Sequence, residues 1–476
     1  MKQILLPKKI VCSKNLINGT ALKVKKPLQV VLRRDEGWAE QNAVMKGKGY
    51  IVLDFGKEMC GSIRIITGEA PAQVRVRIRF GESLSETSSD IGVKGATNSH
   101  SARDFEVCLS LLGNVSFGDT GFRYVRLDFL DDAKVVLQNI YCENKIFSKK
   151  SIYKYNGQDK LVSKIFNTAK RTVDLCAGGE YVWDGVKRDR LVWIGDMHPE
   201  ILALTTLYGR VKAVERSLNF VKEQTPSNLW MNGIPSYSMW WIICVVDYYK
   251  LTGAVDFVSS QLEYIKMLIS RFDQFIDESG CYKFKYFFVD WPTEKSADRE
   301  VGTRVINIYA VKKAVEIFRE FGIDVSLAEQ VLSKLTKKDI VVKEKKQVVA
   351  LKYFALGEIS DQEYQILISG GAKGMSTFMS YYILKAIAAK DIDLAISIMK
   401  EYYGAMLSLG ATTFFEDFNI EWLKNASRID KMPKKGQEDI HGDRGDYCYK
   451  GFRHSLCHGW SSAVIKFIEE YKEKLI

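Results

Sequence analysis

The chain has 476 residues, of which 46% are hydrophobic and 27% charged, and this composition excludes a disordered, collagen-like or disulfide-scaffold protein. Its net charge of +11 comes from 69 Lys and Arg against 58 Asp and Glu. Because the basic residues are spread along the chain and mixed with acids, we expect no nucleic-acid partner.

The first 150 residues are expected to form a β domain. Short runs of alternating apolar and polar residues, bounded by Gly, Asp and Asn, recur at 28–32, 49–55, 62–66, 73–80, 105–111, 124–130 and 134–141. Several short strands at such spacing predict an antiparallel β-sandwich. The polar segment 83–101 is rich in Ser, Thr, Asp and Gly and predicts a long loop.

Residues 151–476 show a helical pattern instead. Apolar residues recur every three or four positions from Asp159 onward, and clear helical stretches cover 200–209, 211–223, 239–251, 254–280, 303–321, 326–335, 360–369, 377–390, 392–404 and 461–474. Roughly ten to twelve helices are expected, and a ring of six hairpins is one economical way to bury them, although periodicity alone supports only an all-α domain. The basic run 337–346 is expected to be a solvated face or loop.

The loop 183–196 concentrates residues that could carry chemistry. It holds three acids, three basic residues and two Trp within fourteen positions. Such a mixture suits a polar site in which a sugar stacks on an indole ring while its hydroxyls bond to fixed charges. The alternative is a salt-bridged loop at the start of a helix.

Further segments hold an acid or a His beside aromatic residues. Asp290 and Trp291 precede a Pro in a rigid turn, Glu416 follows two Phe, and His458 lies two residues before a Trp. The alternatives are a helix-capping acid for Glu416 and a satisfied core residue for His458. No nucleophile elbow or phosphate-binding loop occurs. Two acids on separate loops around aromatic residues match the layout of glycoside hydrolysis, in which one carboxylic acid protonates the leaving oxygen and a carboxylate acts from the other face.

The segment 184–196 resembles the signature of glycoside hydrolase family 78, the α-L-rhamnosidases. The matching residues are Asp184, Arg188, Asp189, Arg190, Leu191, Trp193, Gly195 and Asp196. The segments 234–241, 290–292, 374–378, 411–416 and 456–460 are similar to the helical domain of that family and occur in the same order. The resemblance implies a β-sandwich over residues 1–150 followed by an (α/α)6 barrel over 151–476, a fold that is mainly α with an N-terminal β domain.

The same resemblance implies an inverting mechanism and a set of site residues. Asp189 corresponds to the general acid and Glu416 to the general base, so that Asp189 would stay protonated while Glu416 activates a water molecule. The residues implied to bind the sugar are Asp184, Arg188, Trp193, Asp196, Trp240, Asp290, Trp291 and His458. Family members carry a Glu where this chain has Asp189, whose side chain is one methylene shorter.

We therefore expect an α-L-rhamnosidase that removes terminal rhamnose from small rhamnosyl glycosides or oligosaccharides. One alternative is a six-hairpin glycosidase for another α-linked sugar. A second, suggested by Asp189, is a homologue that binds carbohydrate without catalysis. A structural role is the least expected, because several polar-aromatic loops would be costly to keep without a ligand. The oligomeric state is open.

No cofactor is expected, and no metal either, because no carboxylate cluster has the spacing of a calcium loop. The nine cysteines include no CxxC pair and suit reduced thiols. No apolar stretch reaches the roughly 18 residues of a transmembrane helix, and the N-terminal apolar run is too short for a signal peptide. We expect a cytoplasmic protein with no membrane partner.

Overall fold

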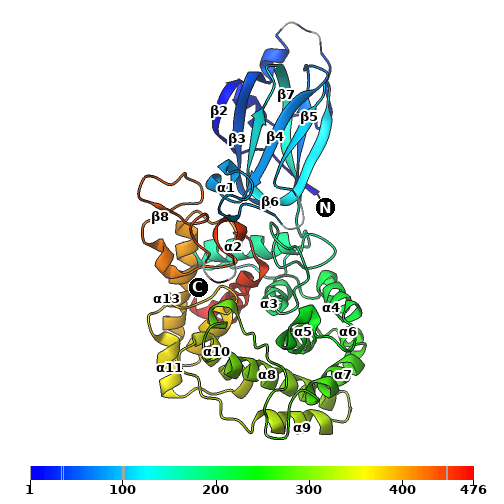
Figure 1. Ribbon diagram of the computed structural model, residues 1–476, viewed down its shortest axis with the longest axis vertical. Helices are drawn as coiled ribbons and strands as arrows, with labels where there is room; N and C mark the ends of the chain where they lie inside the picture. The colour runs from blue at the N-terminus through cyan, green and yellow to red at the C-terminus, as the bar shows by residue number, and fades with distance from the viewer. Residues whose placement is uncertain are drawn as a thin grey trace.

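A β domain formed by the N-terminal part of the chain lies against the side of a ring of helices (Figure 1). The structure is a computed structural model, and it describes residues 2–33, 35, 37–98, 102–445, 447 and 449–475. Within these residues, no helix combines the length and the apolar character needed to cross a membrane.

The β domain is built around two long, bent strands. Its strands are β1 (Lys2–Leu5), β2 (Lys9–Ile17), β3 (Ala43–Thr67), β4 (Val74–Gly81), β5 (Asp104–Leu109), β6 (Asn114–Phe129) and β7 (Lys134–Lys145), in the order β1-β7-β3-β6-β4-β5 with β2 on β3. The first half of β3 pairs with β2 and the end of β6, and its second half pairs with the start of β6. Strand β7 pairs with the first four residues of β3 and again with its second half. The sheet therefore folds into two layers, and its apolar side chains form the core between them.

Three sequence expectations for this domain need correction, while the antiparallel arrangement of its strands is confirmed. The runs 49–55 and 62–66 belong to one strand, β3, whose register with β6 shifts between Asp54 and Met59, where Gly56 has a φ of +81°. The run 28–32 forms no strand, and two of its apolar residues are exposed. The segment 83–101 contains the short helix α1 (Leu84–Ser88), which Ser83 caps.

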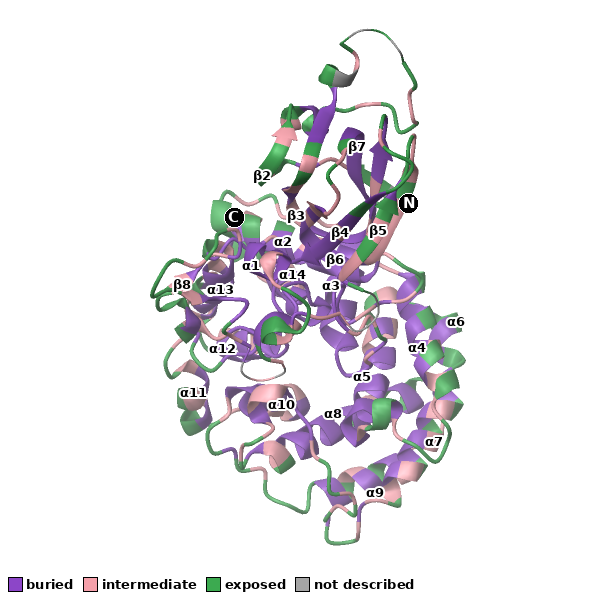
Figure 2. Ribbon diagram, turned by 45° about the horizontal axis from the view of Figure 1, so that its top comes forward, coloured by how far each residue is buried: buried purple, intermediate pink, exposed green. Residues whose placement is uncertain are grey.

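The second domain is a closed ring of paired helices, as expected. The helices are α2 (Lys160–Cys176), α3 (Met197–Tyr208), α4 (Lys212–Gln224), α5 (Pro235–Thr252), α6 (Val255–Ser259), α7 (Leu262–Asp273), α8 (Arg299–Glu320), α9 (Ser326–Leu335), α10 (Lys346–Leu356), α11 (Asp361–Ile368), α12 (Ser380–Ala388), α13 (Ile392–Ser408) and α14 (Val464–Glu470). The inner helices α3, α5, α8, α10, α12 and α14 each contact the next, and α14 returns to α3. Figure 2 shows α3, α5 and α8 largely buried, while the outer α4, α7 and α9 expose one face.

Helix α10 was missed, and its sequence explains why. It begins at Lys346, the last residue of the basic run that predicted a solvated loop. Its residues Val348, Val349, Ala350 and Leu351 are all buried, so the helix lacks the polar face that helical periodicity detects. The predicted helix 254–280 is also divided, because α6 ends at Ser259 and α7 ends at Asp273.

The connections from outer to inner helices lie at one end of the ring, because the chain alternates direction between the two layers. Four of these connections are 177–196, which leads into α3, 225–234 into α5, 274–298 into α8, and 409–463 into α14. They gather the segments that the sequence singled out for chemistry at the same mouth of the barrel.

Candidate active site

Within the loop 183–196, Asp184 closes the segment 184–191 and ties it to the segment before α14 through hydrogen bonds. The Asp184 carboxylate accepts a hydrogen bond from the amide of Leu191 at 2.9 Å, and its carbonyl accepts one from Gly459 at 2.7 Å. Between these anchors, Asp189 and Arg190 have φ angles of +55° and +52°. Left-handed backbone at non-glycine residues costs of order 1–3 kcal/mol and concentrates at functional sites.

A cavity of about 160 Å³ opens at this mouth of the barrel. Its walls come from these four connections and the start of α5, and they consist of Asp184, Arg188, Asp189, Trp193, Asp196, Ile234, Tyr237, Tyr286, Phe288, Trp291, Glu416, Tyr449, His458 and Trp460. The cavity therefore brings together acidic, basic and aromatic side chains that are distant in the sequence, as a carbohydrate site requires.

Glu416 lies in the wall of the cavity and is held rigidly. Its side chain is fully buried, and its Oε2 accepts a hydrogen bond from the Ser455 amide at 2.9 Å. Its carbonyl accepts hydrogen bonds from the Thr377 hydroxyl at 2.5 Å and the Trp460 indole at 3.0 Å. A carboxylate fixed in this way can act on a reactant without first reorganising.

Arg188 links the two carboxyls that the sequence singled out as acid and base. One guanidinium nitrogen contacts Glu416 Oε1, and the other lies 2.6 Å from Asp189 Oδ2. The guanidinium also stacks over the ring of Tyr449 at 3.9 Å. The Glu416 side chain is fully buried, whereas that of Asp189 is 16% exposed. Asp189 is therefore the more accessible of the two carboxyls.

Burial shifts the pKa values of three other polar groups in the cavity. It raises the pKa of Asp196 to about 8, even though the Tyr237 hydroxyl donates a hydrogen bond to this carboxyl at 3.1 Å. Burial also raises the pKa of Asp184 well above its ordinary value and lowers that of His458 to about 4. His458 Nε2 lies 3.9 Å from a carboxyl oxygen of both Asp184 and Asp196. In all three groups burial disfavours the charged form, and each can exchange hydrogen bonds with sugar hydroxyls.

An aromatic wall faces these polar groups. Tyr237 packs edge-on against Trp193 and Phe288, and Phe288 packs edge-on against Trp291. Tyr286 stacks on Phe288 and is 44% exposed at the rim. Sequence reasoning did not select Ile234, Tyr237, Tyr286, Phe288, Tyr449 or Trp460 as site residues. Ile234, Tyr237 and Trp460 lie in segments that matched the family, and Phe288 begins the segment that holds Asp290 and Trp291. Tyr286 and Tyr449 carry no comparable signal.

Two predicted sugar-binding residues do not line this cavity. Trp240 is fully buried in α5, where its ring packs against His198, Phe378 and Tyr382. It faces the core because α5 is an inner helix with few exposed positions. Asp290 is buried as well and acts as a cap, since it accepts hydrogen bonds from the Thr293 amide at 3.1 Å and the Ser376 hydroxyl at 2.7 Å. Asp290 therefore orients the turn that carries Trp291. The other predicted residues line the cavity.

Two family models match the chain. The concanavalin-like domain of bacterial α-L-rhamnosidases matches residues 45–144, and the six-hairpin glycosidase domain of bacterial α-L-rhamnosidases matches residues 151–323. No curated protein sequence matches the chain.

Several solved structures share the fold at low sequence identity. A rhamnosidase from Klebsiella oxytoca with rhamnose bound has a TM-score of 0.75 and 18% identity over 99% of this chain and 96% of its own. The family 78 rhamnosidase of Bacillus sp. GL1 has a TM-score of 0.71 and 20% identity over 94% of this chain and 48% of its own. An α-L-rhamnosidase of Streptomyces avermitilis complexed with L-rhamnose has a TM-score of 0.65 and 12% identity over 98% of this chain and 43% of its own. This chain thus spans about half the length of the last two.

The fold, the cavity and the matching domains define the chain as a glycoside hydrolase of the six-hairpin type. It belongs to the family of bacterial α-L-rhamnosidases, whose two domain models together match more than half of its residues.

Proposed function

We propose that the protein is an inverting α-L-rhamnosidase that removes terminal rhamnose from small glycosides. The observation that carries this proposal is the cavity itself, in which one guanidinium, that of Arg188, contacts both Asp189 and Glu416. An inverting glycosidase needs an acid on the leaving-group side and a base on the water side. The difference in exposure between the two carboxyls supports this division of roles.

In the proposed mechanism, Asp189 gives its proton to the glycosidic oxygen while Glu416 takes a proton from the attacking water. Arg188 contacts both carboxyls, so it can stabilise the charge that appears on Asp189 as the charge on Glu416 disappears. The buried Asp184, Asp196 and His458 would hold the sugar hydroxyls.

The aromatic wall supports the choice of sugar. Rhamnose is a 6-deoxy sugar with a methyl group in place of a hydroxymethyl group. An apolar face built by Phe288 and Trp291 can receive that methyl without leaving a hydroxyl unpaired. The cavity is small, which supports the release of one terminal residue. We further propose cytoplasmic action on small rhamnosides.

The experiment that tests the proposal is the release of p-nitrophenol from p-nitrophenyl α-L-rhamnoside, with Asp189→Asn and Glu416→Gln beside the wild type. We expect both variants to fold and to lose about 10²-fold or more of the activity. Proton NMR of the first anomer released distinguishes inversion from retention. Full activity of Glu416→Gln would show that Glu416 is not the general base.

Two other results would favour the alternatives. Hydrolysis of a different aryl glycoside, with none of the rhamnoside, would keep the mechanism and replace the sugar. L-rhamnose binding by isothermal titration calorimetry, with no turnover of any glycoside, would favour a carbohydrate-binding homologue.

A further inference from the structure

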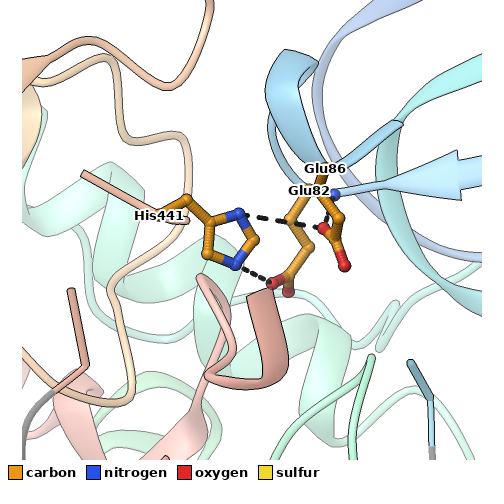
Figure 3. A group of neighbouring side chains, drawn as sticks. All are labelled: Glu82, Glu86 and His441. Atoms are coloured by element: carbon orange, nitrogen blue, oxygen red, sulfur yellow. Dashed lines mark hydrogen bonds and ion pairs between the residues drawn. The ribbon is translucent and has the colours of Figure 1, made fainter. Parts of the chain in front are cut away.

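A fully buried cluster lies between the two domains, outside the cavity. Glu82 and Glu86 come from the β domain around α1, and His441 comes from the long connection before α14 (Figure 3). Ligand atoms of the three side chains lie within 4.8 Å of one another, a spacing that could hold a metal ion. The Lys187 ammonium occupies this place, since its Nζ lies 3.1 Å from Glu82, 3.2 Å from Glu86 and 3.3 Å from His441 Nε2. The cation of this cluster is therefore supplied by the chain itself.

Lys187 connects the cluster to the acid side of the active site. It directly precedes Arg188 and Asp189 in the sequence, and its side chain is 1% exposed. Its ammonium also donates hydrogen bonds to the carbonyls of Phe452 and His454, at 2.6 and 2.9 Å. The loop that carries Asp189 is thus fixed to the β domain one residue before Arg188.

Glu82 connects the same cluster to the base side. Its Oε1 accepts a hydrogen bond from the Ser455 hydroxyl at 2.9 Å, and its Oε2 accepts one from the Leu456 amide at 2.6 Å. Ser455 in turn donates its amide to the Glu416 carboxylate and accepts the Glu416 amide at its carbonyl, both at 2.9 Å. One residue, Ser455, therefore separates Glu82 from the proposed base.

We propose that Glu82 of the β domain is a positioning residue, which holds Lys187 on the acid side and Ser455 and Leu456 on the base side, and so sets the relative position of Asp189 and Glu416. This inference rests on the proposed function for the roles of these two carboxyls. It makes the β domain a part of the catalytic machinery, because the side chain that spans both loops belongs to that domain.

The chemistry of the three donors requires a carboxylate at position 82. An ammonium, a hydroxyl and an amide N–H converge on Glu82, and a carboxylate offers acceptors only. A Gln side chain of the same shape has one acceptor oxygen, and its NH2 group would face a donor. The Glu82→Gln substitution therefore releases at least one of the contacts without creating a cavity.

The matched control is Glu86→Gln. Glu86 is equally buried and lies beside the same ammonium, but no hydrogen bond to Ser455 or Leu456 is described for it. Asp104→Asn serves as a second control, because Asp104 is a buried carboxyl of the β domain that pairs with Arg77 away from the helical ring. Ser455→Ala removes the hydroxyl donor to Glu82, together with the contacts of that hydroxyl to the Cys457 backbone, but keeps the Leu456 amide and Lys187 on Glu82. It gives a milder variant should Glu82→Gln not fold.

Two measurements test the proposal. In kinetics, we expect kcat of Glu82→Gln to fall about 10²-fold, since misplacement of catalytic groups by about 1 Å has an effect of this size, while the dissociation constant for L-rhamnose stays unchanged. The kcat of Ser455→Ala should also fall, by a smaller factor, and Asp104→Asn should keep the wild-type kcat. In hydrogen exchange followed by mass spectrometry, peptides covering 184–192 and 452–460 should exchange faster in Glu82→Gln, whereas in Glu86→Gln the second peptide should stay protected.

Wild-type kcat in a folded Glu82→Gln, or equal effects of Glu82→Gln and Glu86→Gln on both peptides, would overturn the proposal. If Glu82→Gln does not fold, unchanged kcat and unchanged exchange in Ser455→Ala overturn it. A wild type that hydrolyses no glycoside would refute the proposed function instead, and the hydrogen-exchange comparison then decides whether Glu82 holds the two loops.

Discussion

Arg188 and Glu416 lie 228 residues apart in the chain and form an ion pair whose side chains are 3% and 0% exposed. Arg188 belongs to the connection between α2 and α3, and Glu416 to the connection between α13 and α14. Because α13 packs against α2, these connections become neighbours only when the ring of helices closes. Closure of the barrel therefore assembles the active site.

The first prediction concerns Arg188→Met. We expect the variant to be about 3–5 kcal/mol less stable, because it leaves the charge of Glu416 buried without its cationic partner. We also expect activity on the aryl rhamnoside to be lost. Urea denaturation and the p-nitrophenol assay measure the two effects.

Arg453→Met is the matched control for this substitution. Arg453 stacks on the same Tyr449 ring, with its guanidinium carbon 4.7 Å from the ring centre, but no contact with Glu416 is described for it. It should change stability by less than about 1 kcal/mol, the usual range for exposed cation–π contacts. If the two variants lose equal stability, the Arg188–Glu416 pair does not have the role assigned to it.

The second prediction concerns the pH dependence of stability. Burial raises the pKa of Asp196 to about 8 in the folded protein, against 3.8 for an ordinary Asp. Between these values the folded state keeps a proton that the unfolded state has lost, so the contribution of Asp196 to stability falls as the pH rises toward about 8 and is constant above. The difference in unfolding free energy between Asp196→Asn and the wild type should therefore increase from about pH 5 to about pH 8.

Asp104→Asn provides the contrast for Asp196. Although burial works in the opposite direction, the Arg77 guanidinium holds the pKa of Asp104 below its usual value. The stabilisation by Asp104 is therefore complete above the ordinary pKa and is lost only as the pH falls below it. Urea denaturation across the same pH range should show a constant difference for Asp104→Asn. A constant difference for Asp196→Asn as well would contradict the inferred protonation of Asp196.

The sequence was sufficient to predict the ring of helices and most of the acidic site. The residues Asp184, Arg188, Asp189 and Asp196 lie within one loop, and their spacing matched a known signature. Glu416 could be placed beside them only through the resemblance, because nothing local in the sequence shows which distant loop closes the ring. Tyr286 and Phe288 were not predicted as site residues for the same reason, because nothing local in the sequence shows that their loop lies beside the loop 183–196.

The sequence did not show which aromatic side chains lie in the core and which line the cavity. Trp240 and Trp291 both lie near the starts of inner helices and both suit a sugar site. In the structure, the Trp240 side chain points into the barrel core. Trp291 lies on a turn before α8, and its ring lines the cavity. The contact between Glu82 and Leu456 spans 374 residues and two domains, which no local pattern could reveal.

The third prediction separates these two Trp residues. Trp291→Leu should raise KM for the rhamnoside and weaken L-rhamnose binding, because it removes an aromatic face from the cavity. Trp240→Phe should leave KM unchanged and lower stability by about 1–3 kcal/mol through the void it leaves in the core. Steady-state kinetics and thermal denaturation of both variants check this assignment. If KM rises in Trp240→Phe and not in Trp291→Leu, then Trp240 contacts the sugar and Trp291 does not.

The fourth prediction concerns the close approach of Gly195 to Tyr237. A Cβ at Gly195 would lie 2.2 Å from Cε1 of the Tyr237 ring, and this ring is buried between Trp193 and Phe288. Gly195→Ala must therefore displace the ring, at a cost of about 1–3 kcal/mol for overpacking. The displacement would also break the hydrogen bond from the Tyr237 hydroxyl to Asp196.

We expect Gly195→Ala to bind L-rhamnose more weakly and to lose activity, whereas Gly404→Ala should do neither. Gly404 lies inside α13, where an added Cβ would meet Leu161 at an ordinary distance of 3.5 Å. Because Ala is a better helix former than Gly, Gly404→Ala should raise stability by about 0.5–1 kcal/mol. Isothermal titration calorimetry and urea denaturation of the two variants test the pair, and wild-type sugar affinity in Gly195→Ala would show that Tyr237 can move without loss of the site.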